Sequence, residues 1–247
     1  MEETKVESPP REIIEYLRSA PTPYISDALA QHGILNTQMW GILPFTPFDD
    51  VHKHIAGPAF TMRFLKTYNM QSVYESPYKR DEFVEVAPAG SVIVIEGRGI
   101  ICLGERGCAT AVRSGLEAVV SDGPIRDVDG IRARNFPVFI PGGGGALGIK
   151  MQSYVNVPAE CVGWNMPIYV EIPGKPGAVV RPGDVVVGDN NGVVVIPRKY
   201  FDTVVETVKQ IWGLEEDMQR MIDEGKSWKD IYPTVHARKY GQEKKKG

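Results

Sequence analysis

Residues 90–145 read GSVIVIEGRGIICLGERGCATAVRSGLEAVVSDGPIRDVDGIRARNFPVFIPGGGG, and their pattern indicates the fold class of the chain. In it, three short apolar runs of β-type residues alternate with two stretches of helical character. The apolar runs lie at 91–95, 117–120 and 136–140, and the helical stretches at 105–113 and 126–134. Such alternation is typical of βαβ units with a parallel sheet. The sequence therefore predicts an α/β fold with a parallel βαβ core.

Three charged residues fall at the starts of the two predicted helices. Glu105 begins the first helix, and the pair Arg126-Asp127 begins the second, with twenty residues between them. Each helix follows a parallel strand, so both starts lie at the carboxyl edge of the sheet, where open α/β sheets bind ligands. Two acids and one arginine at that edge predict a divalent metal and a small anionic substrate.

The chemistry of these side chains suits a 2-oxo acid, which carries a carboxylate beside a carbonyl. Arg126 could bind one of its oxygens or stabilise an enolate, and Asp127 could hold Mg²⁺ or Mn²⁺. Glu105 could orient a metal-bound water that donates or accepts a proton. A structural role is the alternative: Asp127 would cap its helix, and Arg126 would pair with Asp129 or Glu117.

The composition is that of an ordinary globular protein. The chain has 247 residues, 43% of them hydrophobic and 24% charged, which is enough for a substantial core. A net charge of −3 gives no general electrostatic reason to bind nucleic acid, and no apolar run reaches the roughly 18 residues of a membrane span. The N-terminal residues are polar and acidic, unlike a secretory signal, and the three cysteines form no CxxC pair. We therefore expect reduced thiols and a cytoplasmic location.

Outside the central stretch, prolines and glycines mark the limits of further elements. They are a helix at 10–20, a second helix capped by Ser26 or Asp27 and running to 31, an irregular connection at 36–48 and a strand at 55–65. Asn191-Gly192, between two valine-rich runs, predicts a hairpin of antiparallel strands beside the parallel core. Apolar residues at helical spacing predict a helix from 200 to about 224, whose face would cover the sheet or a neighbouring subunit.

No segment has the composition of a linker between domains. We therefore expect a single domain over residues 1–247, with a loose arm at 1–9 and a C-terminal extension at about 225–247.

The motif of an acid, twenty residues and then Arg-Asp is accompanied by further segments through most of the chain. These are ISDAL (25–29), AGPAFTMR (56–63), VVSDGPIRDVDGIRARNFPVF (119–139) and VRPGDVVVGDNNGVVVIP (180–197). With them, the chain resembles the family of class II 4-hydroxy-4-methyl-2-oxoglutarate aldolases and RraA-type regulators of RNase E over roughly residues 20–210. The resemblance implies a layered α/β/β/α sandwich of the swivelling β/β/α type, assembled as trimers or hexamers.

The resemblance also implies roles for individual residues. Arg126 would contact the 2-oxo acid, Asp127 would ligate the divalent metal, and backbone amides of the loop 104–107 would bind the substrate carboxylate. The substrate-binding candidates in that loop are Gly104, Glu105, Arg106 and Gly107. Arg106 could pair with a second carboxylate of the substrate, or it could point to solvent. An acid from the C-terminal helix of a neighbouring subunit would complete the site, and the candidates for it are Glu206, Glu215 and Glu216.

The activity implied by the resemblance is retro-aldol cleavage of a 4-hydroxy-2-oxo acid to pyruvate and a second carbonyl compound, catalysed by a lyase that depends on Mg²⁺ or Mn²⁺. Oxaloacetate decarboxylation would be a side activity, because it also generates pyruvate enolate. The alternative, from a different class, is a non-catalytic protein-binding regulator of a ribonuclease. The complete set of Glu105, Arg126 and Asp127 favours the enzyme.

Other side chains carry weaker arguments. His52 and His54 would share a strand face and could bind a metal, although such pairs more often lie at the surface. Lys66 could form a Schiff base, as in class I aldolases, but we expect it to be solvated. Glycines 142–145 suggest a phosphate cradle yet lack the following Lys-Ser/Thr, so we expect a loop near the site. Cys108 sits among alanines and is expected to pack in the core.

Overall fold

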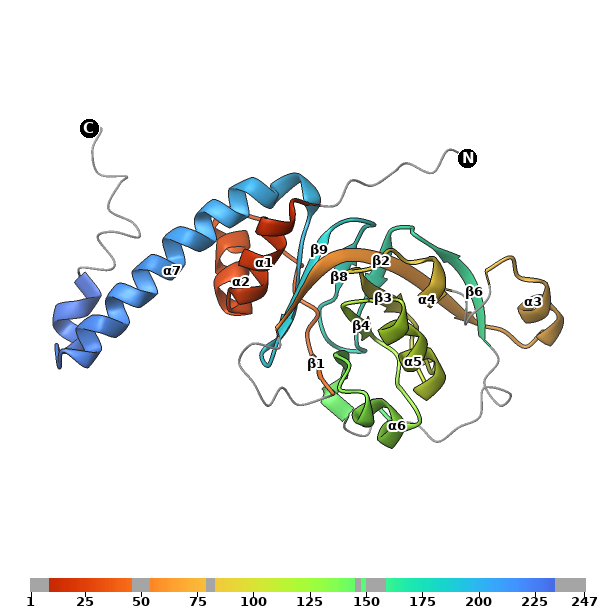
Figure 1. Cartoon of the computed structure of the whole chain (residues 1–247). Helices are drawn as coiled ribbons and strands as arrows, with labels where there is room; N and C mark the ends of the chain where they lie inside the picture. The colour runs from red at the N-terminus through yellow and green to blue at the C-terminus, as the bar shows by residue number, and fades with distance from the viewer. Residues whose placement is uncertain (1–8, 46–53, 79–82, 145–147, 150–158, 234–247) are drawn as a thin grey trace.

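A computed structural model describes residues 9–45, 54–78, 83–144, 148–149 and 159–233 (Figure 1). The predictions for His52, Gly145, nearly all of the N-terminal arm and the end of the C-terminal extension fall outside these residues. The labelled α-helices follow one another in chain order. They are α1 (Arg11–Ser19), α2 (Thr22–Gln31), α3 (Met70–Glu75), α4 (Phe83–Val86), α5 (Glu105–Arg113), α6 (Val128–Ala133) and α7 (Phe201–Asp223). None of the helices in the described part of the chain is long and apolar enough to cross a membrane.

The main sheet is mixed, with a parallel centre, as the sequence predicts. Its strands follow the order β1-β5-β4-β3-β2-β9-β10, and β6 pairs with β2. Their bounds are β1 (Ile42–Pro44), β2 (Ile55–Lys66), β3 (Val92–Glu96), β4 (Ala118–Ser121), β5 (Val138–Pro141), β6 (Ala159–Trp164), β9 (Val185–Asp189) and β10 (Gly192–Ile196). The pairs β2–β3, β3–β4 and β4–β5 are parallel. The predicted βαβ core is therefore confirmed.

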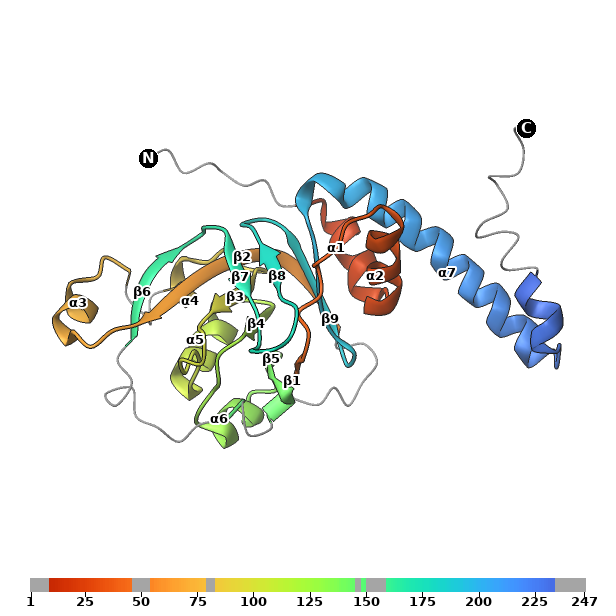
Figure 2. The ribbon, with the colours of Figure 1, turned by 180° about the vertical axis from the view of Figure 1, so that it is seen from behind.

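Strand β3 contributes side chains to the cores on both faces of the main sheet, because successive side chains of a strand point to opposite faces. Ile93 and Ile95 pack on one face in a core that includes Cys108 and Ala111 of α5. Val92 and Val94 pack on the other face, against the small antiparallel sheet of β7 (Ile168–Val170) and β8 (Ala178–Val180). In Figure 2 this small sheet lies in front of the main one. The result is a layered mixed α/β fold with helices and strands on opposite faces.

A third core lies where α1, α2 and α7 cover β9 and β10. Val204, Val208 and Ile211 of α7 are buried there with Leu17 of α1 and Leu29 of α2. The predicted apolar face of α7 thus covers elements of its own chain over the first half of the helix. The second half runs away from the sheet, beyond α1 and α2 (Figure 1).

Three expectations about local structure need correction. Helix α2 begins at Thr22, earlier than the predicted caps. Proline is tolerated in a first helical turn, and the carboxylate of Asp189 accepts hydrogen bonds from the Thr22 amide and hydroxyl at 2.9 and 2.8 Å. The connection at 36–48 contains β1, which pairs antiparallel with β5. Asp189 pairs with Gly192, so the hairpin turn lies one residue earlier than Asn191-Gly192 predicts.

Candidate active site

The two helices that carry the predicted site begin beside one another at the carboxyl edge of the parallel strands. Helix α5 begins at Glu105 and ends at Arg113, as predicted. Helix α6 begins at Val128 rather than at Arg126, so Arg126 and Asp127 occupy the end of the loop that precedes it. The sequence-predicted residues are nevertheless brought together, because the loops before the two helices run side by side.

Backbone hydrogen bonds join these two loops. The N–H of Cys102 donates to the carbonyl of Pro124 at 2.9 Å, and the N–H of Arg126 donates to the carbonyl of Leu103 at 3.0 Å. Leu103 and Ile125 form a parallel bridge between them. The loops therefore continue the sheet beyond β3 and β4, and they deliver Glu105 and Arg126 to the same place.

Asp127 links the three charged residues. Its Oδ2 accepts from the backbone N–H of Glu105 at 3.3 Å, and its Oδ1 accepts from Nε of Arg126 at 3.0 Å. Its backbone is left-handed, with φ 59° and ψ 47°, a conformation that costs energy outside glycine and is concentrated at functional sites. The expected alternative, in which Asp127 caps its own helix, is wrong: its side chain makes no such bond and instead caps α5. Glu117, one of the two partners suggested for Arg126, is paired with Arg18.

Glu105 rests on α6. Its Oε1 accepts from Nη2 of Arg134 at 3.2 Å, and a Cβ atom added to Gly130 would lie 2.3 to 2.5 Å from atoms of its side chain. Gly130 and Arg134 are four residues apart and thus share one face of the helix. Neither residue was predicted from the sequence, although a glycine one turn before an arginine, in a helix next to the motif, is a signal that could have drawn attention to them.

The site is open to solvent. The side chains of Glu105, Arg126 and Asp127 are 49%, 31% and 40% exposed. The first N–H groups of a helix have no partner inside it. In α5 the amide of Glu105 is taken by Asp127, while those of Arg106 and Gly107 follow it at the positive end of the helix dipole, where anions bind. The predicted loop 104–107 is therefore placed to receive a carboxylate.

The donor set suits a hard divalent cation that keeps most of its water. Within the described residues, no group of three or more His, Cys, Asp or Glu side chains is arranged to hold a metal. Mg²⁺ is commonly bound through one or two carboxylates with waters and substrate oxygens. The Asp127 carboxylate, which accepts one protein hydrogen bond on each oxygen and is partly exposed, can supply such a ligand.

The weaker candidates do not gather at this site. Nδ1 of His54 lies 3.1 Å from the backbone carbonyl of Arg18, and Lys66 is exposed at the end of β2. Burial raises the pKa of the Cys108 thiol to about 11, which keeps it protonated in the core. All three cysteines lie in described segments, are buried and form no disulfide. Glu206, a candidate acid for a neighbouring site, accepts from Lys209 at 2.7 Å on α7.

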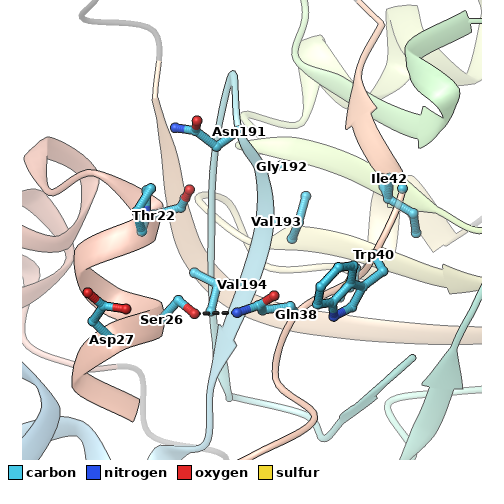
Figure 3. Close-up of a pocket in the computed structure, with 13 residues that line it drawn as sticks. Thr22, Ser26, Asp27, Gln38, Trp40, Ile42, Asn191, Gly192, Val193 and Val194 are labelled. Carbon is cyan, nitrogen blue, oxygen red and sulfur yellow. Dashed lines mark hydrogen bonds between the residues drawn. The ribbon is translucent and has the colours of Figure 1, made fainter. Parts of the chain in front are cut away.

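A separate cavity of about 340 Å³ lies between α2, β10 and the segment before β1 (Figure 3). Its polar side chains include Ser26, which accepts a hydrogen bond from Gln38, and the carboxylate of Asp27. Among the described residues that line the cavity there is no arginine or lysine, so none of them supplies a cation for the carboxylate of an oxo acid. We therefore place the candidate active site at Glu105, Arg126 and Asp127.

Comparison with known proteins defines the family. The family model RraA-like, described as Aldolase/RraA, matches residues 22–195. This chain belongs to that family of RraA-like proteins. It is 32% identical over 217 residues to a Halalkalibacterium halodurans protein that carries the provisional name 4-hydroxy-4-methyl-2-oxoglutarate aldolase, covering 86% of this chain and 90% of that protein. It is also 30% identical over 220 residues to protein DlpA of Legionella pneumophila, covering 86% of this chain and about a third of the length of DlpA.

Solved structures confirm the fold. A protein of Pseudomonas syringae pv. tomato superposes with a TM-score of 0.75 at 24% identity, covering 93% of this chain and 97% of that one. Streptomyces coelicolor RraAS2, described as an unusual member of the RNase ES inhibitor RraA protein family, superposes with a TM-score of 0.71 at 22% identity, covering 86% and 98%. At these identities the likeness speaks for the fold alone.

Proposed function

We propose that this protein is a divalent-metal-dependent lyase that cleaves a 4-hydroxy-2-oxo acid by a retro-aldol reaction to pyruvate and a second carbonyl compound. One observation carries the proposal: the carboxylate of Asp127 binds both the start of α5, at the Glu105 amide, and the guanidinium of Arg126. An acid, an arginine and a possible metal ligand thus share one solvent-open edge. The relative named as an aldolase supports a carbon–carbon lyase in this family.

The substrate would bind across the starts of α5 and α6. Its carboxylate would accept hydrogen bonds from the amides of Arg106 and Gly107, and Arg126 would face the 2-oxo oxygen. When bound at Asp127, Mg²⁺ or Mn²⁺ would supply Lewis-acid polarisation of the 2-oxo group. A second carboxylate on the distal part of the substrate would meet the exposed side chain of Arg106.

The reaction removes a proton from the C4 hydroxyl and breaks the C3–C4 bond, whose electron pair passes to C3 as pyruvate enolate. The fixed positive charge of Arg126 would stabilise the developing enolate. Glu105, held by Arg134 and half exposed, would move the proton between the C4 hydroxyl, water and C3. Decarboxylation of oxaloacetate would use the same groups, since it leaves the same enolate.

The second candidate is a non-catalytic regulator of a ribonuclease. It is favoured by the family description, which covers RraA proteins together with aldolases. The two functions differ in what they require of Glu105, Arg126 and Asp127, because a protein-binding surface needs no proton donor beside a metal ligand. We further propose self-association as a trimer or hexamer, with an acid of α7 reaching a neighbouring site.

The test is release of pyruvate by the purified protein. Oxaloacetate and a series of 4-hydroxy-2-oxo acids are incubated with Mg²⁺ or Mn²⁺, and pyruvate is followed with lactate dehydrogenase and NADH. We expect turnover that requires the metal. Absence of pyruvate from every substrate, in a folded protein loaded with metal, would reject the lyase, and binding to purified ribonuclease E would then be measured.

A further inference from the structure

The two loops that carry the candidate site begin directly after β3 and β4. A buried carboxyl group joins the first residues of these loops and takes no part in the proposed chemistry. Asp122 directly follows β4 and is 5% exposed. Its Oδ1 accepts from the backbone N–H of Gly97 at 2.5 Å and from that of Arg98 at 2.9 Å. Gly97 and Arg98 directly follow β3. One carboxylate therefore ties the ends of two neighbouring strands.

The tied turn is held in an unusual conformation. Arg98 has φ 46°, in the left-handed region that non-glycine residues seldom adopt. Beside it, a Cβ on Gly123 would lie 2.2 Å from the carbonyl oxygen of Ile100, so the two loops are already in close contact at this level. Further along the two loops, their backbones pair with one another up to Glu105 and Arg126. A change at the turn would thus be transmitted along both loops.

The surroundings of Asp122 oppose its charge. The pKa of Asp122 is raised from 3.8 to about 6, mainly because burial disfavours the charged carboxylate; the amides of Gly97, Arg98 and Glu171 lower the pKa, and the nearby carboxylate of Glu96 raises it. Glu96 itself is fully buried and is paired with Arg63 and Arg98. Oδ2 of Asp122 is buried, and among the described residues no donor meets the geometry of a hydrogen bond to it. A proton on the carboxyl group would weaken it as an acceptor from the amides of Gly97 and Arg98.

We propose that ionised Asp122 is a positioning residue that holds the loops 97–104 and 122–127 together and so aligns Glu105 with Arg126 for the reaction. This inference rests on the proposed lyase function. Protonation near pH 6 would leave two neutral hydrogen bonds where there were two charge-assisted ones, which are about twice as strong. The loops would then sample wider positions, and turnover would fall at acid pH.

The test compares D122N with D184N across pH 5 to 8. The D122N side chain keeps an acceptor but cannot ionise, so it mimics protonated Asp122 at every pH. Asp184 is a matched control: it is 3% exposed, and its carboxylate accepts from the amides of Arg181 and Arg198 at 2.9 and 3.0 Å, which lie outside both loops. We expect D122N to lose roughly tenfold in kcat at pH 8 and to converge with the wild type near pH 5. D184N should follow the wild-type profile.

A second readout does not depend on catalysis. Hydrogen exchange, measured by mass spectrometry on peptides that cover 97–104 and corrected for the intrinsic rate at each pH, should be faster in D122N than in the wild type at pH 8 and similar at pH 5. Two outcomes would overturn the role of Asp122. One is equal protection from exchange in D122N and the wild type at pH 8, and the other is a kcat of D122N that falls between pH 8 and pH 5 as steeply as that of the wild type. Lack of pyruvate release by the wild type rejects the lyase function instead, and the exchange data then decide by themselves whether the carboxylate holds the loops.

Discussion

The carboxylate of Asp127 accepts a hydrogen bond from the backbone N–H of Glu105 at 3.3 Å, although the two residues are 22 positions apart. Asp127 therefore caps the helix that Glu105 begins, while its other oxygen holds Arg126 at 3.0 Å. Its charge, its acceptor oxygens and its left-handed backbone are separable properties. Substitutions can remove them one at a time.

Replacing Asp127 by Asn should abolish metal-stimulated pyruvate release and leave the fold intact. Asn accepts the cap hydrogen bond and tolerates φ 59°, but it is a far weaker ligand for Mg²⁺ than a carboxylate. D127A also removes the cap and should lose about 1 kcal/mol of stability. Rates at limiting Mn²⁺ and thermal unfolding check both statements. Wild-type turnover in D127N at limiting metal would show that Asp127 is not the ligand.

Replacing Arg126 by Lys should lower kcat on the order of 10²-fold, although the charge is kept. A lysine lacks the planar fork that holds an oxo acid, and loss of one preorganised donor costs about this much. The control is R113K, in the last turn of helix α5, which should behave as the wild type. Near-normal kcat in R126K would mean that the guanidinium has a structural role.

Replacing Gly130 by Ala should reduce the rate without reducing stability. The new Cβ would meet the carboxyl end of the Glu105 side chain at 2.3 to 2.5 Å, and this flexible side chain can move aside. Alanine is about 1 kcal/mol better than glycine inside a helix, so the fold should gain, while the displaced carboxylate should cost roughly tenfold in kcat. G213A, on α7, is the control that should gain stability alone, since no atom of the described residues lies within 4 Å of the added Cβ. If G130A retains full activity, the position of Glu105 does not matter to the reaction.

The pH dependence of stability should differ between the wild type and D122N. The pKa of Asp122 is raised from 3.8 to about 6 in the folded protein, so ionisation costs the folded state up to about 3 kcal/mol above pH 6. This cost disappears as the pH falls from about 6 to about 4. The wild type should therefore gain stability relative to D122N on acidification, which urea unfolding at pH 8, 6 and 4.5 would measure. A constant difference across that range would contradict the raised pKa.

Removal of divalent metal with EDTA should stop pyruvate release, and Mg²⁺ or Mn²⁺ should restore it. A Schiff-base aldolase needs a lysine that is desolvated or close to another cation, whereas Lys66 is exposed. K66A should therefore keep full activity, and borohydride should trap no pyruvate on the protein. Full activity in EDTA together with a pyruvate adduct in the mass spectrum would identify a metal-independent mechanism.

Three features could be predicted from local sequence patterns: the parallel βαβ core, the bounds of α5 and the grouping of Glu105, Arg126 and Asp127. These depend on short-range signals: β-branched runs of four or five residues, helical periodicity, and the rule that ligands meet parallel strands at their carboxyl ends. The β9–β10 hairpin was likewise predicted, because its turn residues are adjacent in the chain. Such features depend on interactions between residues that are close together in the sequence.

Tertiary structure decided the features whose cause lies far along the chain. Helix α2 begins at Thr22 because Asp189, 167 residues later, accepts a hydrogen bond from the Thr22 amide. Strand β1 forms because it pairs antiparallel with β5. Glu105 rests on Gly130, and Asp122 clamps the turn after β3, because parallel strands bring successive loops together. Hydrogen bonds and close contacts of this kind depend on distances of a few ångströms in three dimensions, and local patterns in a sequence do not specify them.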